Sequence, residues 1–231
     1  MMYSVFNSVS QVRTVASTAA FFDVDNTLLP GTACEIRFFG FLWRRELVGW
    51  RELGESVWWL LRKSRFRTIH PLRERKLYLR GKKPPDIEAL AREFCQLDII
   101  PSISKQGLQQ LEEHRRLGHH IILVTGAPDF LMAPLATYLK VSTVFAAKPV
   151  QQNSVYTGEL TPPLPYGPGK QKLILAHVQE EHIDLSNSFA YGDSPGDVEI
   201  LQLVGHPTVV NPIRGMRRFA ERRGWPITHW I

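Results

Sequence analysis

The sequence predicts an α/β protein in which a mainly parallel sheet is flanked by helices. Short apolar runs alternate with helical patterns over most of the 231 residues, and this order favours parallel strands joined by helical crossovers. Three of the runs, AAFFDVD, HIILVT and SFAYGD, end in polar or acidic residues. Residues 31–98 break the alternation, because they contain no convincing strand, and they predict a helical insertion directly after the first strand.

Five strands and five helices are expected outside the insertion. The strands are placed at Ala19–Asp25, His120–Thr125, Thr143–Ala147, Ser188–Asp193 and His206–Asn211. The helices are placed at Ile103–Leu117, Phe130–Leu139, Gly169–Glu181, Val198–Val204 and Ile213–Arg223. Within Gln151–Gly169, SVYTGEL predicts a small hairpin, and TPPLPYGPG predicts a stiff loop. Ligands of such sheets bind beyond the carboxyl ends of the strands.

The insertion predicts three helical stretches. We expect helix from Glu35 to about Arg62, a break near His70–Pro71, helix again to about Leu79, a GKKPP turn, and helix from Asp86 to Leu97. The helical spacing of its aromatic residues favours a helix-bundle core. A hydrophobic substrate tail or a membrane surface is the alternative. The side chains concerned are Phe39, Trp43, Leu47, Trp50, Trp58 and Trp59.

The charge is concentrated in the insertion. The chain has 28 Lys and Arg against 22 Asp and Glu, a formal net charge of +6. Residues 31–98 hold 15 of the basic and 9 of the acidic residues, so the whole excess lies there. An anionic partner is therefore expected, and the insertion is interpreted as a positive lid that attracts phosphate esters. Its basic run is Arg62, Lys63, Arg65 and Arg67.

Composition narrows the class of protein. Apolar residues make up 44% and charged residues 22%, as in globular proteins, which excludes wholesale disorder. Cys34 and Cys95 match no zinc or redox spacing. No apolar run is long enough to span a membrane. Residues 1–18 are interpreted as an N-terminal extension, with an organelle-targeting segment as the alternative, and the expected location is cytoplasmic. The oligomeric state is not predicted.

Reactive side chains gather where the predicted strands end. Asp23 and Asp25 close the first strand, and Asp193 and Asp197 stand in GDSPGD after another. Two carboxylates at the mouth of a buried strand either hold a divalent cation or divide the roles of nucleophile and acid/base. The structural alternative is that Asp25 and Asp197 only cap the helices that follow them.

Two further groups suit phosphate. Thr125 and Gly126 end the second strand and offer a hydroxyl and bare backbone N–H groups to phosphate oxygens. Lys170, in GPGK at the start of a helix, could neutralise a phosphoryl group. A single lysine at a helix start is more often a solvated residue. A functional role is favoured here because polar residues at three strand ends accompany the lysine.

These groups in chain order resemble a known family. DVDNT, VTGAP, the lysine of GPGK and GDSPGD are similar to the four motifs of the haloacid dehalogenase superfamily of phosphohydrolases. VYTGEL, PYGPGK, YGDSPGD and LVGHPTVVNP resemble its phosphoserine-phosphatase-like branch. The resemblance implies a Rossmann-like core over residues 19–30 and 99–231, with residues 31–98 as an inserted C1-type helical cap.

The resemblance also implies roles for the acidic residues. Asp23 would attack phosphorus and form an aspartyl-phosphate. Asp25 would protonate the leaving oxygen and later accept a proton from water. Mg²⁺ would be held by Asp23, the backbone carbonyl of Asp25 and Asp193, with Asp197 in a supporting position.

The remaining implied roles concern the substrate. Thr125, Gly126 and Lys170 would bind the phosphoryl oxygens. Glu35 and Arg37 are the candidates for substrate specificity, Glu35 because it is the acid nearest after the first motif.

The sequence thus predicts a Mg²⁺-dependent phosphatase that hydrolyses a small phosphorylated metabolite. Two alternatives use the same core: hydrolysis of a lipid phosphate, and phosphotransfer to an alcohol. A third alternative is a non-catalytic basic module that binds a membrane or nucleic acid. Under this alternative the presence of all four intact motifs would be a coincidence. Nucleic acid is therefore not the expected partner, whereas peripheral membrane contact through the Trp-rich cap stays open.

Overall fold

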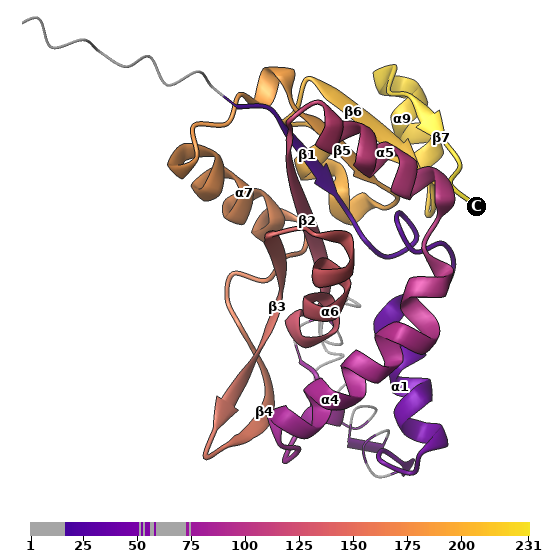
Figure 1. The fold of residues 1–231 in the computed structure, drawn as a ribbon, viewed down its shortest axis with the longest axis vertical. Coiled ribbons are helices and arrows are strands. Elements are labelled where there is room, and N and C mark those ends of the chain that lie inside the picture. The colour runs from indigo at the N-terminus through magenta and orange to yellow at the C-terminus, as the bar shows by residue number, and fades with distance from the viewer. Residues whose placement is uncertain (1–16, 51, 53, 56–57, 59–72, 74) are drawn as a thin grey trace, which may run out of the picture.

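A computed structural model describes residues 17–231 except 51, 53, 56–57, 59–72 and 74. Its described strands form one seven-stranded sheet in the order β4-β3-β2-β1-β5-β6-β7 (Figure 1). All neighbours are parallel except β3 and β4, which form an antiparallel hairpin. The bounds are β1 Ala19–Phe22, β2 His120–Pro128, β3 Thr143–Gln152, β4 Val155–Thr161, β5 Phe189–Gly192, β6 His206–Val210 and β7 Ile227–Thr228.

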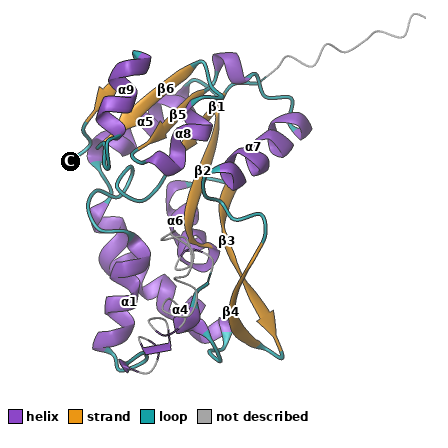
Figure 2. Cartoon of the chain, turned by 180° about the vertical axis from the view of Figure 1, so that it is seen from behind, coloured by secondary structure: helices purple, strands orange, loops and turns teal. Residues whose placement is uncertain are grey.

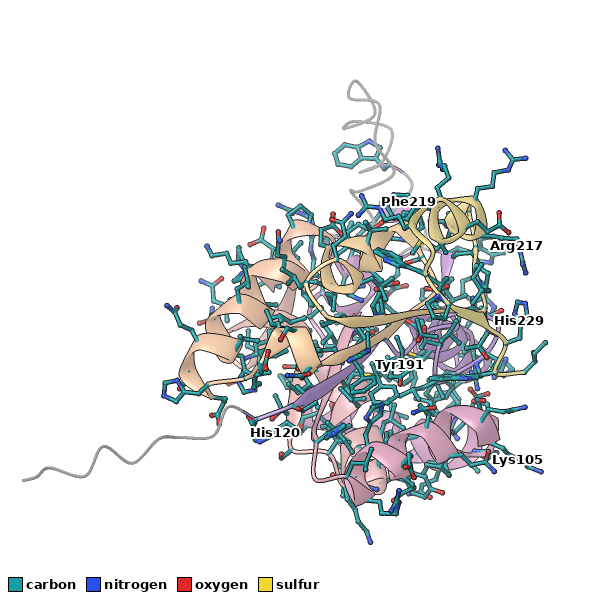
Figure 3. All side chains as sticks on the ribbon, turned by 90° about the horizontal axis from the view of Figure 1, so that it is seen from above. Lys105, His120, Tyr191, Arg217, Phe219 and His229 are labelled. Carbon is teal, nitrogen blue, oxygen red and sulfur yellow. The ribbon has the colours of Figure 1, made fainter. Side chains whose placement is uncertain are left out.

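Helices cover both faces of the sheet (Figure 2). Alternate residues of β1 point to opposite faces: Phe22 packs in the apolar cluster that includes Leu111 of α5, and Phe21 in the cluster that includes Ile174 of α7. Seen from above, Tyr191 lies among packed side chains, whereas Lys105 and Arg217 lie at the outer edge (Figure 3). The α-helices are α1 Cys34–Arg44, α4 Pro84–Phe94, α5 Lys105–Arg116, α6 Asp129–Leu139, α7 Pro168–Glu180, α8 Val198–Leu201 and α9 Met216–Arg223.

The predicted α/β fold is confirmed outside the insertion. All five predicted strands and five helices are present, and so is the hairpin around SVYTGEL. The strands β2 and β3 run beyond their predicted ends, and β7 was not predicted.

Inside the insertion several predictions are wrong. The first helix ends at Arg44 instead of running to Arg62, because the chain turns back at Glu46, whose φ is 59°, and the Leu47 N–H donates to the Leu42 carbonyl at 3.0 Å. Leu77–Leu79 is a 3₁₀ turn and not the end of an α-helix. The third predicted helix, Asp86 to Leu97, is confirmed as α4, and beyond α4 the helical path continues to Ile99 as a π-helical turn.

The aromatic prediction fails at Trp50, whose side chain is 78% exposed instead of lying in a helix-bundle core. Trp43 packs beside it, with ring centroids 5.1 Å apart, and is itself half-buried. The predicted break at His70–Pro71, Trp59 and the basic run lie outside the described residues, and so do residues 1–16.

Two kinds of contact fasten the insertion to the rest of the chain. Phe38 of α1 meets Phe94 of α4 and Phe130 of α6, with ring centroids 5.3 and 5.8 Å apart, so one apolar cluster runs from the sheet into the insertion. The β3–β4 hairpin extends beside α4 (Figure 1) and pairs with residues 75–82. The Lys76 N–H donates to the Gly158 carbonyl at 2.8 Å. The division into core and cap at residues 30/31 and 98/99 stays a prediction.

Within the part of the chain that the structure describes, no helix has both the length and the apolar character needed to cross a membrane.

Candidate active site

Two acidic side chains meet because their strands are neighbours. Asp23 follows β1 and Asp193 follows β5, and the two strands pair in parallel up to Phe22 and Tyr191. The Asp23 N–H donates to the Tyr191 carbonyl at 2.9 Å and so continues the pairing by one residue. Both carboxylates therefore leave the sheet at its carboxyl edge.

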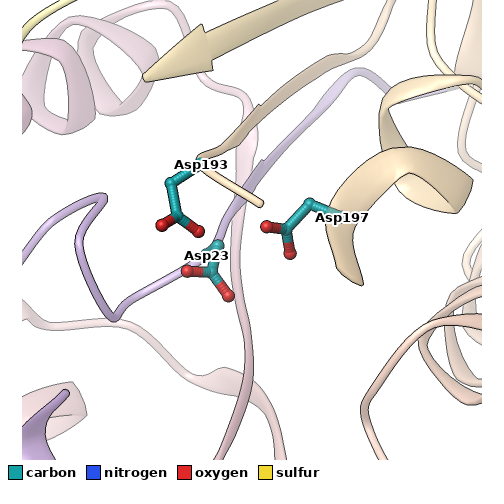
Figure 4. Close-up of side chains that lie close together, drawn as sticks. All are labelled: Asp23, Asp193 and Asp197. Atoms are coloured by element: carbon teal, nitrogen blue, oxygen red, sulfur yellow. The ribbon is translucent and has the colours of Figure 1, made fainter. Parts of the chain in front are cut away.

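A third carboxylate joins them from the turn after β5. Asp197 ends a 3₁₀ turn in which the Ser194 N–H and hydroxyl donate to its Oδ2 at 3.1 and 2.8 Å. A Cβ on Gly192 would lie 2.5 Å from the Asp197 Cβ, so only glycine admits this close approach. Figure 4 shows the carboxylates of Asp23, Asp193 and Asp197 turned toward one another, and oxygens of all three lie within 4.8 Å of each other.

Lys170 of α7 completes the cluster. Its Nζ donates to Asp23 Oδ1 and to Asp197 Oδ1, both at 2.6 Å, and its side chain is only 3% exposed. A Cβ on Gly169 would lie 1.8 Å from the Leu164 carbonyl oxygen, so the preceding loop packs directly on the start of α7 and fixes where the lysine enters. The lysine predicted as a phosphate ligand is thus a buried residue and not a solvated one.

Burial and mutual repulsion perturb the acids. Burial, followed by the charge of Asp197, raises the pKa of Asp23 well above its usual value and that of Asp193 to about 7. Burial also acts to raise the pKa of Asp197, but the Lys170 ammonium and the hydrogen bonds from Ser194 together outweigh it and lower the pKa. Burial acts against the charged lysine as well, yet Asp197 and Asp23 raise the pKa of Lys170 overall. One ammonium therefore faces three carboxylates, and the site carries a negative excess.

The cluster fits a small divalent cation. Its donors are all carboxylate oxygens, which Mg²⁺ prefers, and three of them converge around one lysine. A cation there would offset both the burial of these carboxylates and their mutual repulsion, which raise the pKa values of Asp23 and Asp193. Asp23 and Asp193, which were predicted as metal ligands, lie together in this cluster, and Asp197 belongs to the same group.

The other predicted residues lie around this cluster. Asp25 Oδ1 accepts the Cys34 N–H at 2.7 Å, at the start of α1. Leu123 of β2 pairs with Phe22, which places Thr125 two residues further toward the carboxyl edge, where its Oγ1 accepts the Ala127 N–H at 3.1 Å. The adjoining Gly126 is exposed, so its backbone is open to a ligand.

The two specificity candidates are engaged within the protein. Glu35 forms an ion pair with Lys76 and accepts the Tyr78 hydroxyl at 3.0 Å. Arg37 forms an ion pair with Asp98 and donates to the Asp98 carbonyl at 2.8 Å. Arg37 thus ties α1 to the chain that returns toward α5.

Asn26 is a site residue that the sequence prediction missed. Its φ is 57°, and its Nδ2 donates to Asp193 Oδ2 at 2.9 Å and to the Asn211 carbonyl at 3.0 Å. Asn211 returns a bond from its own Nδ2 to the Asn26 carbonyl at 2.8 Å. The available signal was an asparagine directly after the two acids of DVD, a residue type that tolerates the left-handed conformation.

A parallel sheet that gathers three carboxylates and a buried lysine at its carboxyl edge has the architecture of an α/β enzyme, in which ligands bind at that edge. A family model of the haloacid dehalogenase-like hydrolases matches residues 20–202. The chain belongs to this family, as its four motifs predicted.

Individual relatives agree with this assignment. A Streptomyces azureus protein named inhibition of morphological differentiation protein is 31% identical over 91% of this chain and 77% of its own length. Phosphoserine phosphatase SerB1 of Mycobacterium tuberculosis is 29% identical over 91% of this chain and 70% of its own. A crystal structure of a Bordetella pertussis protein of unknown function superposes with a TM-score of 0.80, at 26% identity, over 94% of this chain and all of that one. The prediction of a phosphatase of the phosphoserine-phosphatase-like branch is confirmed.

Proposed function

We propose that the chain is a Mg²⁺-dependent phosphomonoesterase that forms an aspartyl-phosphate on Asp23 and acts on a small phosphorylated metabolite. The observation that supports this most directly is the buried Lys170, which contacts Asp23 and Asp197 at 2.6 Å while Asp193 lies beside them. A lysine in that position aligns the Asp23 carboxylate and offsets charge where a phosphoryl group would enter.

Asp23 and Asp193, together with the backbone carbonyl of Asp25, would hold Mg²⁺, and Asp197 would support them. When bound, the metal offsets the charge of the phosphoryl oxygens and so makes attack by an anionic nucleophile feasible. Asn26 orients Asp193 through its amide, and Ser194 and Lys170 orient Asp197. Such supporting contacts fix ligand direction before the metal arrives.

The reaction divides into two steps. An Asp23 carboxylate oxygen attacks phosphorus, the bond from phosphorus to the ester oxygen breaks, and Asp25 gives that oxygen a proton. Asp25 then takes a proton from water, which attacks phosphorus and releases phosphate and free Asp23. One residue thus serves as acid and then as base, and two easier barriers replace one high barrier.

Phosphoryl binding is assigned to Thr125, Gly126 and Lys170. The threonine hydroxyl and the exposed Gly126 backbone lie at the same sheet edge as Asp23. Removing one such donor typically costs about 10²–10³ in kcat.

The leaving group would face the cap. Glu35 is the acid placed to recognise the ammonium of phosphoserine, but Lys76 already neutralises it and Tyr78 occupies its second oxygen. We therefore favour a phosphate ester without an ammonium group, even though the relative SerB1 is named for phosphoserine.

The test is the Asp23→Asn variant assayed with Mg²⁺ on p-nitrophenyl phosphate and on a panel of metabolite and lipid phosphates. We expect activity in the wild type, loss of activity in the variant, and acid-stable labelling of the wild type alone after a quench with ³²P-labelled substrate. Asp86→Asn on the exposed side of α4 is the matched control. Turnover in Asp23→Asn comparable with the wild type would refute the nucleophile. Products formed with added alcohols distinguish hydrolysis from phosphotransfer.

A further inference from the structure

Asn26 and Asn211 form a reciprocal pair across the carboxyl edge of the sheet. Asn26 lies in the loop after β1, and Asn211 directly follows β6. Each side-chain Nδ2 donates to the backbone carbonyl of the other residue, at 3.0 Å from Asn26 and at 2.8 Å from Asn211. Both residues have a positive φ, 57° and 44°, which few residue types other than glycine and asparagine adopt. We call this pair the asparagine clasp.

The side-chain oxygens of the clasp are also engaged, which fixes the orientation of both amides. Asn26 Oδ1 accepts the Gly31 N–H at 3.2 Å, and Asn211 Oδ1 accepts the Trp230 N–H at 2.9 Å. Turning either amide over would place its oxygen against a backbone carbonyl oxygen and its nitrogen against a backbone N–H. The clasp therefore keeps the Nδ2 of Asn26, and not its Oδ1, against the Asp193 carboxylate.

This amide occupies one of the two Asp193 oxygens. The Asn26 Nδ2 lies 2.9 Å from Asp193 Oδ2, and the Ile213 N–H fixes the backbone by donating to the Asp193 carbonyl at 3.0 Å. A metal ion bound to both oxygens would have to share Oδ2 with the amide, whose partly positive hydrogens repel a cation. Asp193 therefore offers a cation its Oδ1.

The neighbouring acids are restricted in the same way. Asp23 Oδ1 accepts the Lys170 ammonium at 2.6 Å, which leaves its Oδ2 for a cation. Asp197 accepts Lys170 on Oδ1 at 2.6 Å and the Ser194 hydroxyl on Oδ2 at 2.8 Å, so both of its oxygens are engaged. Asp23 and Asp193 thus each have one oxygen bound to a protein donor and one oxygen left for a metal.

We propose that the asparagine clasp makes the site selective for Mg²⁺, which takes one oxygen from a carboxylate, against Ca²⁺, which often takes two. This inference rests on the proposed Mg²⁺ site. Mg²⁺ requires near-octahedral geometry at about 2.0–2.1 Å and is held by one or two carboxylates and several waters. Ca²⁺ takes about six to eight oxygens at about 2.3–2.6 Å and accepts bidentate carboxylates. Two single oxygens suit the first ion and underfill the shell of the second.

Asn211 is a positioning residue for this site. Its side chain bonds to Asn26 and Trp230, and it acts on Asp193 through Asn26. Loss of either amide would free the Asp193 carboxylate to turn and to offer both oxygens. The selectivity should therefore depend on Asn26 and Asn211 jointly and not as two separate contributions.

The test measures the dissociation constants of Mg²⁺ and Ca²⁺ by calorimetry at pH 8 in the wild type, Asn26→Gly, Asn211→Gly and the double variant. Glycine accepts the positive φ of both positions and removes only the amide. The ratio of the Ca²⁺ constant to the Mg²⁺ constant should fall about 10-fold in each single variant, because Mg²⁺ affinity drops and Ca²⁺ affinity does not. The double variant should show no further fall.

Two more variants complete the design. Asn153→Gly, at a φ of 50° in the turn between β3 and β4, is the matched control and should keep the wild-type ratio. Asn26→Asp keeps the shape of the side chain but replaces the donor with an oxygen, and it should lower the ratio as Asn26→Gly does. Circular dichroism checks that each variant is folded.

Three results would overturn the proposal: an unchanged ratio in Asn26→Gly and Asn26→Asp, a wild type that binds neither ion, or a double variant whose ratio falls by the product of the two single effects. If no phosphate ester is hydrolysed but the ratio depends on the clasp, the proposed phosphatase function fails and the selectivity stands. If esters are hydrolysed and the ratio does not change, the function stands and the selectivity fails.

Discussion

Replacing Lys170 with Met would leave three buried carboxylates without the cation that two of them contact. Lys170 is 3% exposed, as is Asp197, and the two Nζ to carboxylate distances are 2.6 Å. Breaking a buried ion pair on one side costs about 3–5 kcal/mol, because the remaining charge has no partner. Unfolding entropy of about 2.1 cal/mol/K per residue gives ~0.5 kcal/mol/K for this chain, so Tm should fall by about 6–10 °C.

The assay is thermal unfolding followed by circular dichroism in EDTA at pH 8 and pH 5, with Lys172→Met on the exposed side of α7 as control. The pKa values of Asp23 and Asp193 are already raised, so the folded state binds more protons than the unfolded one and gains stability as the pH falls. Without Lys170 this gain is larger, and the Tm deficit should shrink at pH 5. A variant with wild-type Tm at pH 8, or a deficit that grows at pH 5, would refute the reasoning.

Three further outcomes are expected. Mg²⁺ should raise Tm more at pH 8 than at pH 6 in fluorimetric melts, because burial and then Asp197 raise the pKa of Asp193 to about 7 and protons compete with the metal below it. Asn26→Ala should weaken Mg²⁺ binding about 10-fold by calorimetry, since the Asp193 carboxylate loses its amide donor. His114, whose pKa burial lowers to about 4, binds fewer protons folded than unfolded, so His114→Gln should show less loss of stability than the wild type between pH 6.5 and pH 4.

Each of these outcomes can be contradicted by a measurement. Equal Mg²⁺ shifts at both pH values would mean that Asp193 does not titrate in this range. Asn153→Ala, in a hairpin turn with a φ of 50°, tests whether a left-handed asparagine matters by itself, and should leave Mg²⁺ affinity intact. For His114, parallel stability curves of variant and wild type would show that the imidazole is not the group that opposes folding in acid.

The strands were predictable because they are buried. The run before Asp23 has four residues that are all buried, and such short apolar runs that end in acids stand out in the sequence. β7 has only two residues, which is too short for a recognisable alternation of apolar and polar side chains. The early end of α1 could not be predicted, because apolar residues continue at helical spacing through Leu47 and Trp50. The chain reversal depends instead on backbone hydrogen bonds to the Leu42 and Trp43 carbonyls.

The candidate site was predictable to the extent that its residues stand in short motifs. The acids and Lys170 were found at strand and helix ends, where local sequence marks them. The role of Asn26 depends on partners 167 and 185 residues away. Pairings of this kind form only when the chain has folded, so no local sequence pattern predicts them.

The pairing between residues 75–82 and the β3–β4 hairpin bears on how substrate specificity could be exchanged between relatives. The Lys76 N–H donates to Gly158, the Gly81 N–H to the Tyr156 carbonyl, and the Tyr156 N–H to Lys82, so backbone groups of a core hairpin are satisfied by the insertion. A chimera that transplants residues 31–98 alone would force a foreign segment onto this edge. The unit to transplant is the insertion together with residues 148–161, and chimeras cut that way should fold where simpler exchanges do not.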